Sequence, residues 1–538
     1  MALLDIRQLD VAIHGVPILD SIGVSLDAGE ILGVAGESGS GKTMMALAVA
    51  GLLPAGATTS GDILLDGVHL IDLGEGDYTA IRGRDIGIVF QEPMTALNPL
   101  MTIGDQVAEA ARVQQGLSRR AAQALAGATL DRVGLPAADF PLDRYPHSLS
   151  GGQRQRVAIA IAIALKPKLL IADEPTTALD VSTQAGILEL FRSLVRDDGI
   201  GLMLVTHDLA VIAETADRVA VMRAGKIVEA GDAGSVLGAP ESSYTRSLLA
   251  DTVHTPERTR PGRTGQEPVL EVHNIVREYV TRRGMLGRAR PVRAVDDVSL
   301  AIYENENVGL VGESGCGKST LLRTILGLDA AQSGEIRVFG ETFPAPGKAD
   351  MRRLRKRLQV VFQDPFGSFD PRWRVRELVA ENFHLLDTPP TRAEATRKVD
   401  AMLEQVGLKP SDAFRYPHEF SGGQRQRLAI ARALITEPAI IALDEAVSAL
   451  DVSVRARILD LLAELSDRLG VSYLFVTHDL SVLRSIADRV LVMRAGRIVE
   501  QGRAEDVFAN PAHDYTAGLL QALPDLEQAL SQGASADG

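Results

Sequence analysis

Short apolar runs recur along the chain, and each ends at a glycine-rich loop, an acidic residue or a polar residue. Residues 31–35 and 308–311 lead into glycine-rich loops, and residues 42–53 and 318–328 after those loops have helical character. Runs of this length predict strands that are buried on both faces, as in a parallel sheet. Similar runs occupy residues 86–90, 169–172, 201–206, 358–362, 439–443 and 472–477. Buried strands alternating with helices predict an α/β fold.

None of these apolar runs is long enough to cross a membrane. The longest, residues 157–165, has nine residues, whereas a membrane helix needs about 18 or more. The first ten residues alternate apolar and charged positions and show no signal peptide. If the protein works at a membrane, we expect other chains to span it.

The chain repeats itself once. Residues 150–156 recur as 421–427, residues 178–182 as 449–453, and residues 206–209 as 477–480, all at one constant offset. A period this long indicates a duplicated domain. We therefore expect a first domain over residues 1–253 and a second over 269–525. Residues 254–268, polar and rich in proline, glycine and arginine, predict a flexible linker, and residues 526–538 a disordered tail.

Composition narrows the class of protein. The net charge of −14 argues against nucleic-acid binding, which usually needs a basic face. The single cysteine, Cys316, excludes a disulfide framework and a cysteine-ligated zinc site within one chain, and it fits a reducing compartment.

Both domains carry a phosphate-binding loop, or P-loop. GESGSGKT spans residues 36–43 and GESGCGKS spans residues 312–319. In such loops backbone N–H groups surround the phosphates of ATP, the lysine reaches the β- and γ-phosphates, and the last hydroxyl binds Mg²⁺. The predicted nucleotide-binding residues are Gly36, Ser38, Gly39, Ser40, Gly41, Lys42 and Thr43, with Gly312, Ser314, Gly315, Cys316, Gly317, Lys318, Ser319 and Thr320. We expect Cys316 to act mainly through its backbone N–H.

The strands that follow predict a hydrolytic site. One ends in Asp173 and Glu174, and its counterpart ends in Asp444 and Glu445. Beside a P-loop, the aspartate is placed to bind Mg²⁺ and the glutamate to polarise the attacking water. Two further pairs also follow buried strands, at the edge where ligands bind in such sheets: His207 and His478, which could contact the γ-phosphate, and Gln91 and Gln363, which could contact Mg²⁺ or the water. Thr43, Gln91, Asp173, Ser319, Gln363 and Asp444 are the candidate Mg²⁺ ligands.

In order and spacing these motifs resemble the ATP-binding-cassette (ABC) family. The most specific of them is the signature, LSGGQ at residues 149–153 and FSGGQ at 420–424. The resemblance implies two cassettes, each with a mostly parallel core sheet, an antiparallel β subdomain and a helical subdomain carrying the signature. It also implies head-to-tail pairing within the chain, so that each signature closes over the opposite P-loop. The signature residues expected to bind ATP are Ser150, Gly151, Gly152 and Gln153, with Ser421, Gly422, Gly423 and Gln424.

Two departures from the family pattern stand out. Family members usually stack an aromatic residue on adenine; Tyr279 is the candidate in the second domain, whereas the first offers only Ile13 and His14. In addition, Pro175 and Thr176 after the first Asp-Glu pair become Ala446 and Val447 after the second. We expect that exchange to be tolerated, because the acidic residues are unchanged.

The branch of the family is also suggested by resemblance. Tandem cassettes that recognise DNA damage or recycle ribosomes need metal-binding cysteines, which this chain lacks. The segments around residues 89–104, 145–156 and 361–375 resemble the peptide and nickel importers. So do residues 240–249 and 511–520, which carry Tyr244-Thr245 and Tyr515-Thr516 after each cassette, although these could be mere packing segments.

The resemblance implies two integral-membrane permease subunits, a substrate-binding protein outside the membrane, and a place on the cytoplasmic face of a bacterial inner membrane. A soluble ATPase acting on ribosomes or nucleic acid, an exporter, and an importer of nickel chelates, glutathione or glycosides remain alternatives. The stretches 92–102 and 364–375, with Met94 and Phe366, are the expected permease contacts.

Overall fold

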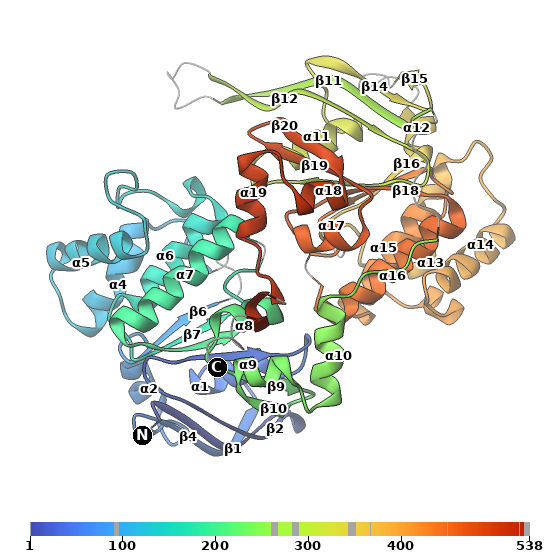
Figure 1. Ribbon diagram of the computed structural model, residues 1–538. Helices are drawn as coiled ribbons and strands as arrows, with labels where there is room; N and C mark the ends of the chain where they lie inside the picture. Colours follow the sequence, from blue (N-terminus) through green and yellow to red (C-terminus); the bar gives the residue numbers. More distant parts are fainter. Residues whose placement is uncertain are drawn as a thin grey trace.

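The computed structural model describes residues 2–90, 96–177, 179–259, 267–281, 290–342, 351–365, 367–448, 450–526 and 528–531. We call residues 2–253 the first repeat and residues 267–531 the second repeat. Each forms one α/β unit, and the two units lie against each other (Figure 1). The predicted boundaries between domains and linker stay predictions.

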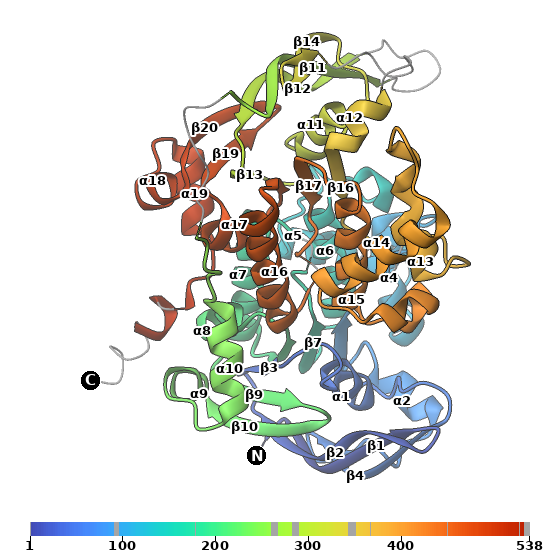
Figure 2. The same ribbon diagram turned by 90° about the vertical axis from the view of Figure 1, so that its right-hand side faces the viewer.

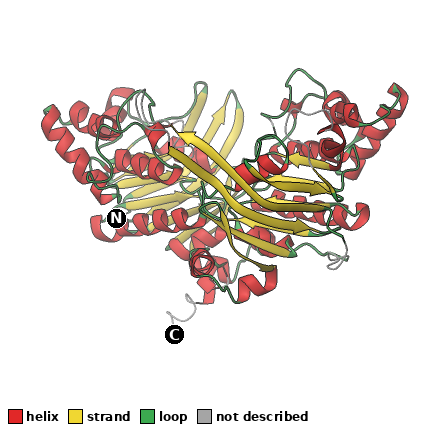
Figure 3. Cartoon of the chain, turned by 90° about the horizontal axis from the view of Figure 1, so that it is seen from above, coloured by secondary structure: helices red, strands yellow, loops and turns green. Residues whose placement is uncertain are grey.

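A six-stranded sheet forms the centre of each repeat. Five neighbouring strands are parallel and the sixth is an antiparallel edge strand, in the orders β10-β9-β3-β8-β7-β6 and β20-β19-β13-β18-β17-β16. The strands of the first repeat are β3 (Ile31–Ala35), β6 (Ile86–Val89), β7 (Leu169–Asp173), β8 (Gly201–Val205), β9 (Arg218–Arg223) and β10 (Lys226–Asp232). Those of the second are β13 (Asn307–Val311), β16 (Leu358–Val361), β17 (Ile440–Asp444), β18 (Ser472–Val476), β19 (Arg489–Arg494) and β20 (Arg497–Arg503). Helices flank the strands (Figure 3), so every residue of β3, β7 and β8 is buried.

A second, antiparallel sheet covers the P-loop side of each core. Its strand order is β2-β1-β4-β5 in the first repeat and β12-β11-β14-β15 in the second. The strands are β1 (Leu4–Ile13), β2 (Val16–Leu26), β4 (Ala57–Leu65) and β5 (Val68–His69), and β11 (Leu270–Thr281), β12 (Arg290–Ile302), β14 (Ser333–Val338) and β15 (Glu341–Thr342). Residues of β1, β2, β4 and the P-loop helix α1 share one hydrophobic cluster.

The helices complete the two layers and form a separate helical subdomain in each repeat. In the first repeat they are α1 (Lys42–Val49), α2 (Glu75–Ile81), α4 (Ile103–Gln114), α5 (Arg119–Arg132), α6 (Gly151–Ile163), α7 (Val181–Asp198), α8 (Leu209–Thr215), α9 (Ala233–Gly238) and α10 (Ser243–Thr252). In the second they are α11 (Lys318–Ile325), α12 (Met351–Arg357), α13 (Val375–Ala380), α14 (Arg392–Gln405), α15 (Gly422–Leu434), α16 (Val452–Leu469), α17 (Leu480–Ile486), α18 (Ala504–Ala509) and α19 (Asp514–Gln521). Helices α4 to α6, and α13 to α15, pack together. The predicted three-part architecture is therefore confirmed.

The P-loop helices are shorter than the sequence pattern predicts. Helix α1 ends at Val49 instead of Leu53. Gly51 adopts a positive φ of 64°, and the N–H of Leu52 donates to the carbonyl of Leu47 at 2.9 Å. This arrangement closes a helix at its C-terminal end, and only a glycine adopts it without strain. Helix α11 ends at Ile325 before Gly327 in the same way.

The two repeats exchange apolar residues across their interface. Val181, the first residue of α7, belongs to the large hydrophobic cluster of the second repeat. Val452, the first residue of α16, packs in a cluster of the first repeat with Tyr244 and Leu248 of α10. Figure 2 shows α10 reaching from the first repeat toward α16. The interface therefore has an apolar component on both sides.

The first part of the expected flexible linker is anchored to the second repeat. His254 Nε2 lies 2.6 Å from Asp460 Oδ1, and the N–H of Thr259 donates to Asp467 Oδ2 at 2.6 Å. Arg258 pairs with Asp488 at 2.6 Å and donates to the carbonyl of Asn305 at 2.9 Å. Residues 254–259 are thus held by specific contacts that composition alone does not reveal, while residues 260–266 lie outside the described residues.

The first residues of the expected disordered tail are ordered and pack against the rest of the chain. Leu526 is buried, residues 528–531 are helical, and Leu530 packs against the first repeat. Two leucines in an otherwise small, polar segment are enough to dock it. Residues 532–538, and residue 527, lie outside the described part. In the parts of the chain that the structure describes, no helix has both the length and the apolar character needed to cross a bilayer.

Candidate active site

The P-loops lie at the edge of each core sheet where β3 and β13 end. Lys42 Nζ donates to the carbonyls of Gly36 at 2.8 Å and Glu37 at 2.9 Å, and Lys318 Nζ donates to the matching carbonyls of Gly312 and Glu313. Both lysines are buried, and burial lowers the pKa of Lys42. Each P-loop therefore surrounds a lysine ammonium group that is available to bind an anion.

Gly36 shows why the loop needs glycine. Its φ is 147°, and a Cβ at this position would lie 2.3 Å from the carbonyl oxygen of Met222. Gly312 is in the same situation against Met493, at 2.1 Å. The glycine pattern therefore reflects close backbone packing against β9 and β19 as well as phosphate binding.

The aspartates sit directly beside the P-loop hydroxyls. Thr43 Oγ1 donates to Asp173 Oδ1 at 3.3 Å. Burial, with the neighbouring Glu174, raises the pKa of Asp173 although the hydrogen bond from Thr43 lowers it. Burial and the charge of Glu445 raise the pKa of Asp444 to about 6. Burial thus favours the neutral form of both aspartates, and a nearby cation would favour the ionised form.

Each glutamate is paired with the histidine of the next strand. His207 Nδ1 lies 3.2 Å from Glu174 Oε1, and His478 Nδ1 lies 3.1 Å from Glu445 Oε1. Burial favours the neutral acid, but the hydrogen bonds and charges around each glutamate, led by those of the histidine and with the P-loop lysine among them, place the pKa of Glu174 and of Glu445 below the ordinary value. The structure therefore brings together the two residues that the sequence left apart, and keeps the glutamate ionised.

The backbone at these glutamates is in an unusual conformation. Glu174 has a φ of 47° and Glu445 a φ of 48°. Their N–H groups donate to the carbonyls of Val205 and Val476, both at 2.8 Å, which fixes the turn to the adjacent strand. A left-handed non-glycine residue costs energy and is tolerated mainly where function needs it. The pattern is the same in both repeats despite the Pro175-Thr176 to Ala446-Val447 exchange.

Removing both histidines, His207→Ala with His478→Ala, should move the acid limb of the ATPase pH profile to higher pH. Without the histidines, the contributions that most lower the pKa are lost, so the pKa of both glutamates rises relative to the unaltered protein. A protonated glutamate cannot accept a proton from water, so turnover falls at a pH where the unaltered protein is still active. The measurement is kcat against pH at saturating Mg·ATP. An acid limb that stays in place, whatever the absolute rate, contradicts the pairing.

The signature serines cap the helices that follow them. Ser150 Oγ accepts the N–H of Gln153 at 3.3 Å, and the N–H of Ser150 donates to Gln153 Oε1 at 3.0 Å. Ser421 and Gln424 form the same reciprocal cap on α15. A Cβ at Gly152 would lie 2.2 Å from Thr183 Cγ2, so this glycine allows α6 to approach α7 closely. The helix N-terminus so built is suited to an anion, and its closure over the opposite P-loop stays a prediction.

The residues just before and at the start of α7 and α16 bring each repeat close to the P-loop of the other repeat. Asp180 Oδ2 accepts the N–H of Ser314 at 3.4 Å, and Ser182 Oγ lies 3.0 Å from Glu313 Oε1. On the other side, the charge of Asp451 acts on Lys42. The repeats are therefore paired head to tail. These residues repeat in the sequence, and that repetition is the signal that could have assigned them to the site.

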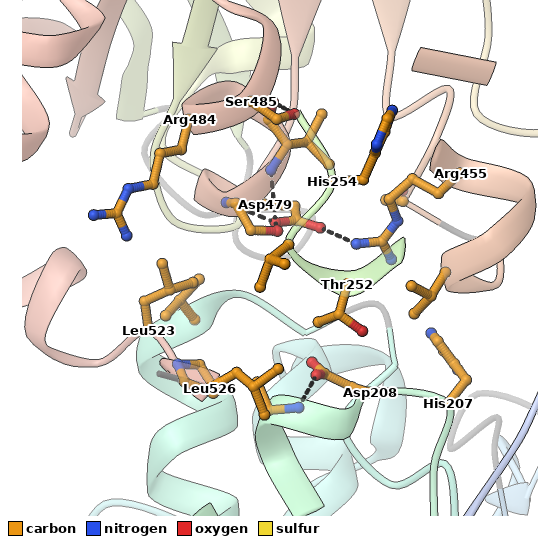
Figure 4. Close-up of a pocket in the computed structure, with 18 of the residues that line it drawn as sticks. His207, Asp208, Thr252, His254, Arg455, Asp479, Arg484, Ser485, Leu523 and Leu526 are labelled. Carbon is orange, nitrogen blue, oxygen red and sulfur yellow. Dashed lines mark hydrogen bonds and ion pairs between the residues drawn. The ribbon is translucent and has the colours of Figure 1, made fainter. Parts of the chain in front are cut away.

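A cavity of about 570 Å³ lies between the two repeats (Figure 4). Its lining includes His207, His478, Asp208, Asp479 and Arg455, and Arg455 Nη1 donates to Asp479 Oδ2 at 3.0 Å. Gln184 stands in the first repeat where Arg455 stands in the second, so the cavity is not symmetric.

The remaining predicted residues have mixed outcomes. Gln91 lies outside the described residues, and Gln363 is exposed directly after β16. Tyr279 donates to Asp329 at 3.1 Å, beyond the C-terminal end of α11, and Arg277 covers its ring at 4.6 Å; its adenine contact stays a prediction. Cys316 is buried, and burial raises the pKa of its thiol, as expected for a structural position. Thr320 follows Ser319 in the first turn of α11.

Comparison with known proteins agrees with the nucleotide-binding site that the geometry indicates. The family model "ABC transporter" matches residues 19–177 and 295–448, and "Oligopeptide/dipeptide transporter, C-terminal region" matches residues 499–538. The peptidoglycan transport ATP-binding protein YejF of Agrobacterium fabrum is 44% identical over 99% of this chain and 98% of its own length. The glutathione import ATP-binding protein GsiA of Pectobacterium atrosepticum is 44% identical over 93% of this chain and 85% of its own.

Among solved structures, a dimeric ATP-binding cassette in a post-hydrolysis state with ADP and Pi aligns with 44% of this chain and 98% of its own length. Its sequence identity is 28% and its TM-score is 0.39. The family models cover more than half of the chain, and the relatives match it almost from end to end. The chain therefore belongs to the ABC transporter family, as an ATPase that carries two ATP-binding cassettes in one polypeptide.

Proposed function

We propose that this chain energises a bacterial importer of peptides or peptide-like solutes through separate permease subunits. The observation that carries the proposal is the match of residues 499–538 to the C-terminal region of oligopeptide and dipeptide transporters. The solutes in the names of the two relatives, glutathione and peptidoglycan, both contain peptide. The ATPase does not contact the solute, so the solute class is inferred from this region and these relatives.

Mg·ATP would bind at both P-loops. Thr43 Oγ1 and Asp173 Oδ1, 3.3 Å apart, form a hydroxyl and carboxylate pair of the kind that Mg²⁺ prefers, and Ser319 and Asp444 are their counterparts. The described residues contain no cluster of three or more His, Cys, Asp or Glu side chains able to hold a metal. Gln91 and Gln363, the nucleotide phosphates and water would supply the other ligands. When bound, Mg²⁺ neutralises charge on the phosphates.

The glutamates would then direct hydrolysis. Glu174 or Glu445 orients a water and accepts its proton, the water oxygen bonds to the γ-phosphorus, and the bond to the ADP oxygen breaks. The paired histidine holds the carboxylate in place and keeps it ionised. Ser150 or Ser421 would bind the γ-phosphate from the opposite repeat, so that ATP holds the repeats closed and its hydrolysis releases them.

The chain would bind two membrane-spanning permeases from the cytoplasmic side of the membrane, through the stretches that follow β6 and β16. A substrate-binding protein would act on the opposite side of the membrane. Met94 and Phe366 lie outside the described residues, but Leu100 and Trp373 belong to the same stretches and are 86% and 39% exposed. Large apolar side chains in such positions are suited to a partner surface.

Leu100→Glu with Trp373→Glu should reduce solute uptake strongly while leaving nucleotide binding unchanged. A charge at each position opposes burial against an apolar partner surface, whereas neither side chain lies at a P-loop. Uptake of labelled peptide by cells and equilibrium ATP binding by the purified protein measure the two effects. Val16→Glu, at an apolar position on β2 that is 60% exposed, between the values for Leu100 and Trp373, is the matched control. Lost ATP binding in the double variant would contradict the assignment.

Affinity purification from mildly solubilised cells tests the function as a whole. We expect two polytopic membrane proteins to co-purify, and a genetically linked binding protein then narrows the solute. Ribosomes or nucleic acid without a membrane partner would overturn the transport proposal and leave the ATPase activity standing.

A further inference from the structure

The helix that follows each cassette carries a tyrosine that touches the P-loop of its own repeat. Tyr244 of α10 accepts the N–H of Glu37 on its hydroxyl at 3.2 Å, and Tyr515 of α19 accepts the N–H of Glu313 at 3.0 Å. Arg223 and Arg494 cover the two rings, each with its guanidinium carbon 4.8 Å from the ring centroid. We call α10 and α19 the tail helices.

These contacts reach the nucleotide-binding lysine through a single residue of each P-loop. Tyr244 accepts the N–H of Glu37, and the carbonyl of the same Glu37 accepts a hydrogen bond from Lys42 Nζ at 2.9 Å. In the second repeat the carbonyl of Glu313 accepts Lys318 Nζ at 3.0 Å. The tyrosine hydroxyl therefore fixes the part of the P-loop that aims the lysine.

The tail helices are themselves fixed to the core sheet. Glu229 of β10 accepts the N–H groups of Glu241 at 2.7 Å and Ser242 at 3.3 Å, just before α10. Glu500 of β20 accepts those of Ala512 at 2.7 Å and His513 at 3.1 Å, just before α19. The same construction in both repeats argues that the position of each tyrosine is specified.

Each tail helix also contacts the opposite repeat. Helix α10 packs against α16, and α19 packs against α7. Ser453 Oγ donates to Asp251 Oδ2 at 2.6 Å, which joins the start of α16 to the end of α10. Asp451, two residues before Ser453, is the residue whose charge acts on Lys42.

The two sides of the interface are not equivalent. In the tail aligned on Tyr244 and Tyr515, Asp251 of the first repeat corresponds to Ala522 of the second. Ser182, the counterpart of Ser453, lies instead beside Glu313 in the second P-loop, at 3.0 Å. The opposite repeat thus contacts the first P-loop region through a tail helix and the second P-loop directly.

We propose that Tyr244 and Tyr515 are positioning residues for ATP binding, and that α10 transmits the docking of α16 to the first P-loop. The proposal rests on the ATPase activity of the family and is independent of the solute. Tyr244 and Ser453 act on the same site from opposite ends of one helix, although they belong to different repeats.

Tyr244→Phe tests the positioning role, in a Lys318→Ala background where the first site dominates binding. The ring and its arginine remain, and only the hydroxyl is lost. The Kd for a slowly hydrolysed thiophosphate analogue of ATP, with Mg²⁺, should rise about two- to twelvefold, with kcat at saturating ATP nearly unchanged. Tyr515→Phe in a Lys42→Ala background should behave alike. Tyr303→Phe, at the opposite end of the core sheet, is the control; an unchanged Kd in Tyr244→Phe would overturn the role whatever its thermal stability.

A double-mutant cycle tests the transmission. Ser453→Ala should also raise the Kd at the first site, and its effect should shrink by about twofold or more when Tyr244→Phe is already present, because contacts that share no atoms otherwise add. Ser453→Ala crossed with Tyr303→Phe should be additive. Additive effects with Tyr244→Phe would overturn the transmission through α10 and leave the positioning role to the first test.

Discussion

Replacing both glutamates, Glu174→Gln with Glu445→Gln, should lower kcat for ATP hydrolysis by about 10²–10⁴-fold while ATP still binds. Glutamine keeps the size of the side chain and a hydrogen bond to the histidine, but it cannot accept a proton from water. The strained turn at each glutamate and its bond to the next strand are backbone features, so they should survive the change. Steady-state phosphate release and equilibrium ATP binding measure the two parts.

The matched control exchanges two exposed glutamates on the helices that follow the site, Glu189→Gln on α7 and Glu464→Gln on α16. These should leave turnover unchanged. We also expect the double glutamate variant to stay in the closed, ATP-bound form, which intramolecular cross-linking of the repeats can detect. Hydrolysis near the unaltered rate would refute the assigned role of Glu174 and Glu445.

Replacing the P-loop lysines, Lys42→Met with Lys318→Met, should remove nucleotide affinity without unfolding the protein. A charge-assisted hydrogen bond contributes about 1.5–3 kcal/mol, so ATP affinity should fall about 10- to 150-fold at each site. Methionine is apolar and of similar length, and it removes a buried charge, so the free energy of unfolding without nucleotide should change by about 1 kcal/mol or less.

Thermal unfolding with and without Mg·ATP separates these effects. The unaltered protein should gain about 2.7 kcal/mol of stability for each occupied site at an ATP concentration 100 times Kd, and the double variant only about 0.3–1.4 kcal/mol per site at the same concentration. Lys226→Met removes an exposed lysine that pairs with Asp20 at 2.8 Å, and it should keep the full gain. A full nucleotide-dependent gain in the double lysine variant would show that the lysines do not bind phosphate.

The sequence predicts much of this fold because the same local rules apply twice. Buried strands such as residues 31–35 and 169–172 are short apolar runs next to glycine or acidic residues, and they form as predicted. The pairing of Glu174 with His207 could be predicted only in part from the sequence. Their strands are neighbours in the sheet, but a motif does not give the 3.2 Å contact.

The contacts between repeats were beyond local reasoning. Composition made residues 254–268 a flexible linker, yet Arg258 and Thr259 find partners on the second repeat. The two tail tyrosines stand out in the sequence as a repeated pattern. However, the P-loop N–H groups that donate hydrogen bonds to their hydroxyls lie about 200 residues away in sequence. Such pairings depend on tertiary packing, and periodicity along the chain carries no information about them.

The anchored segment after α10 changes how the two cassettes meet. Tyr244 of α10 is held at the first P-loop, and Arg258 is held on the second repeat, so only a short stretch of chain joins the two anchors. A short tether gives each repeat an effective concentration, relative to the other repeat, on the order of millimolar, as short flexible linkers do. The proposed closure around ATP would then be a first-order event whose rate does not depend on how much protein the cell makes, and each cassette would meet its unlike partner first.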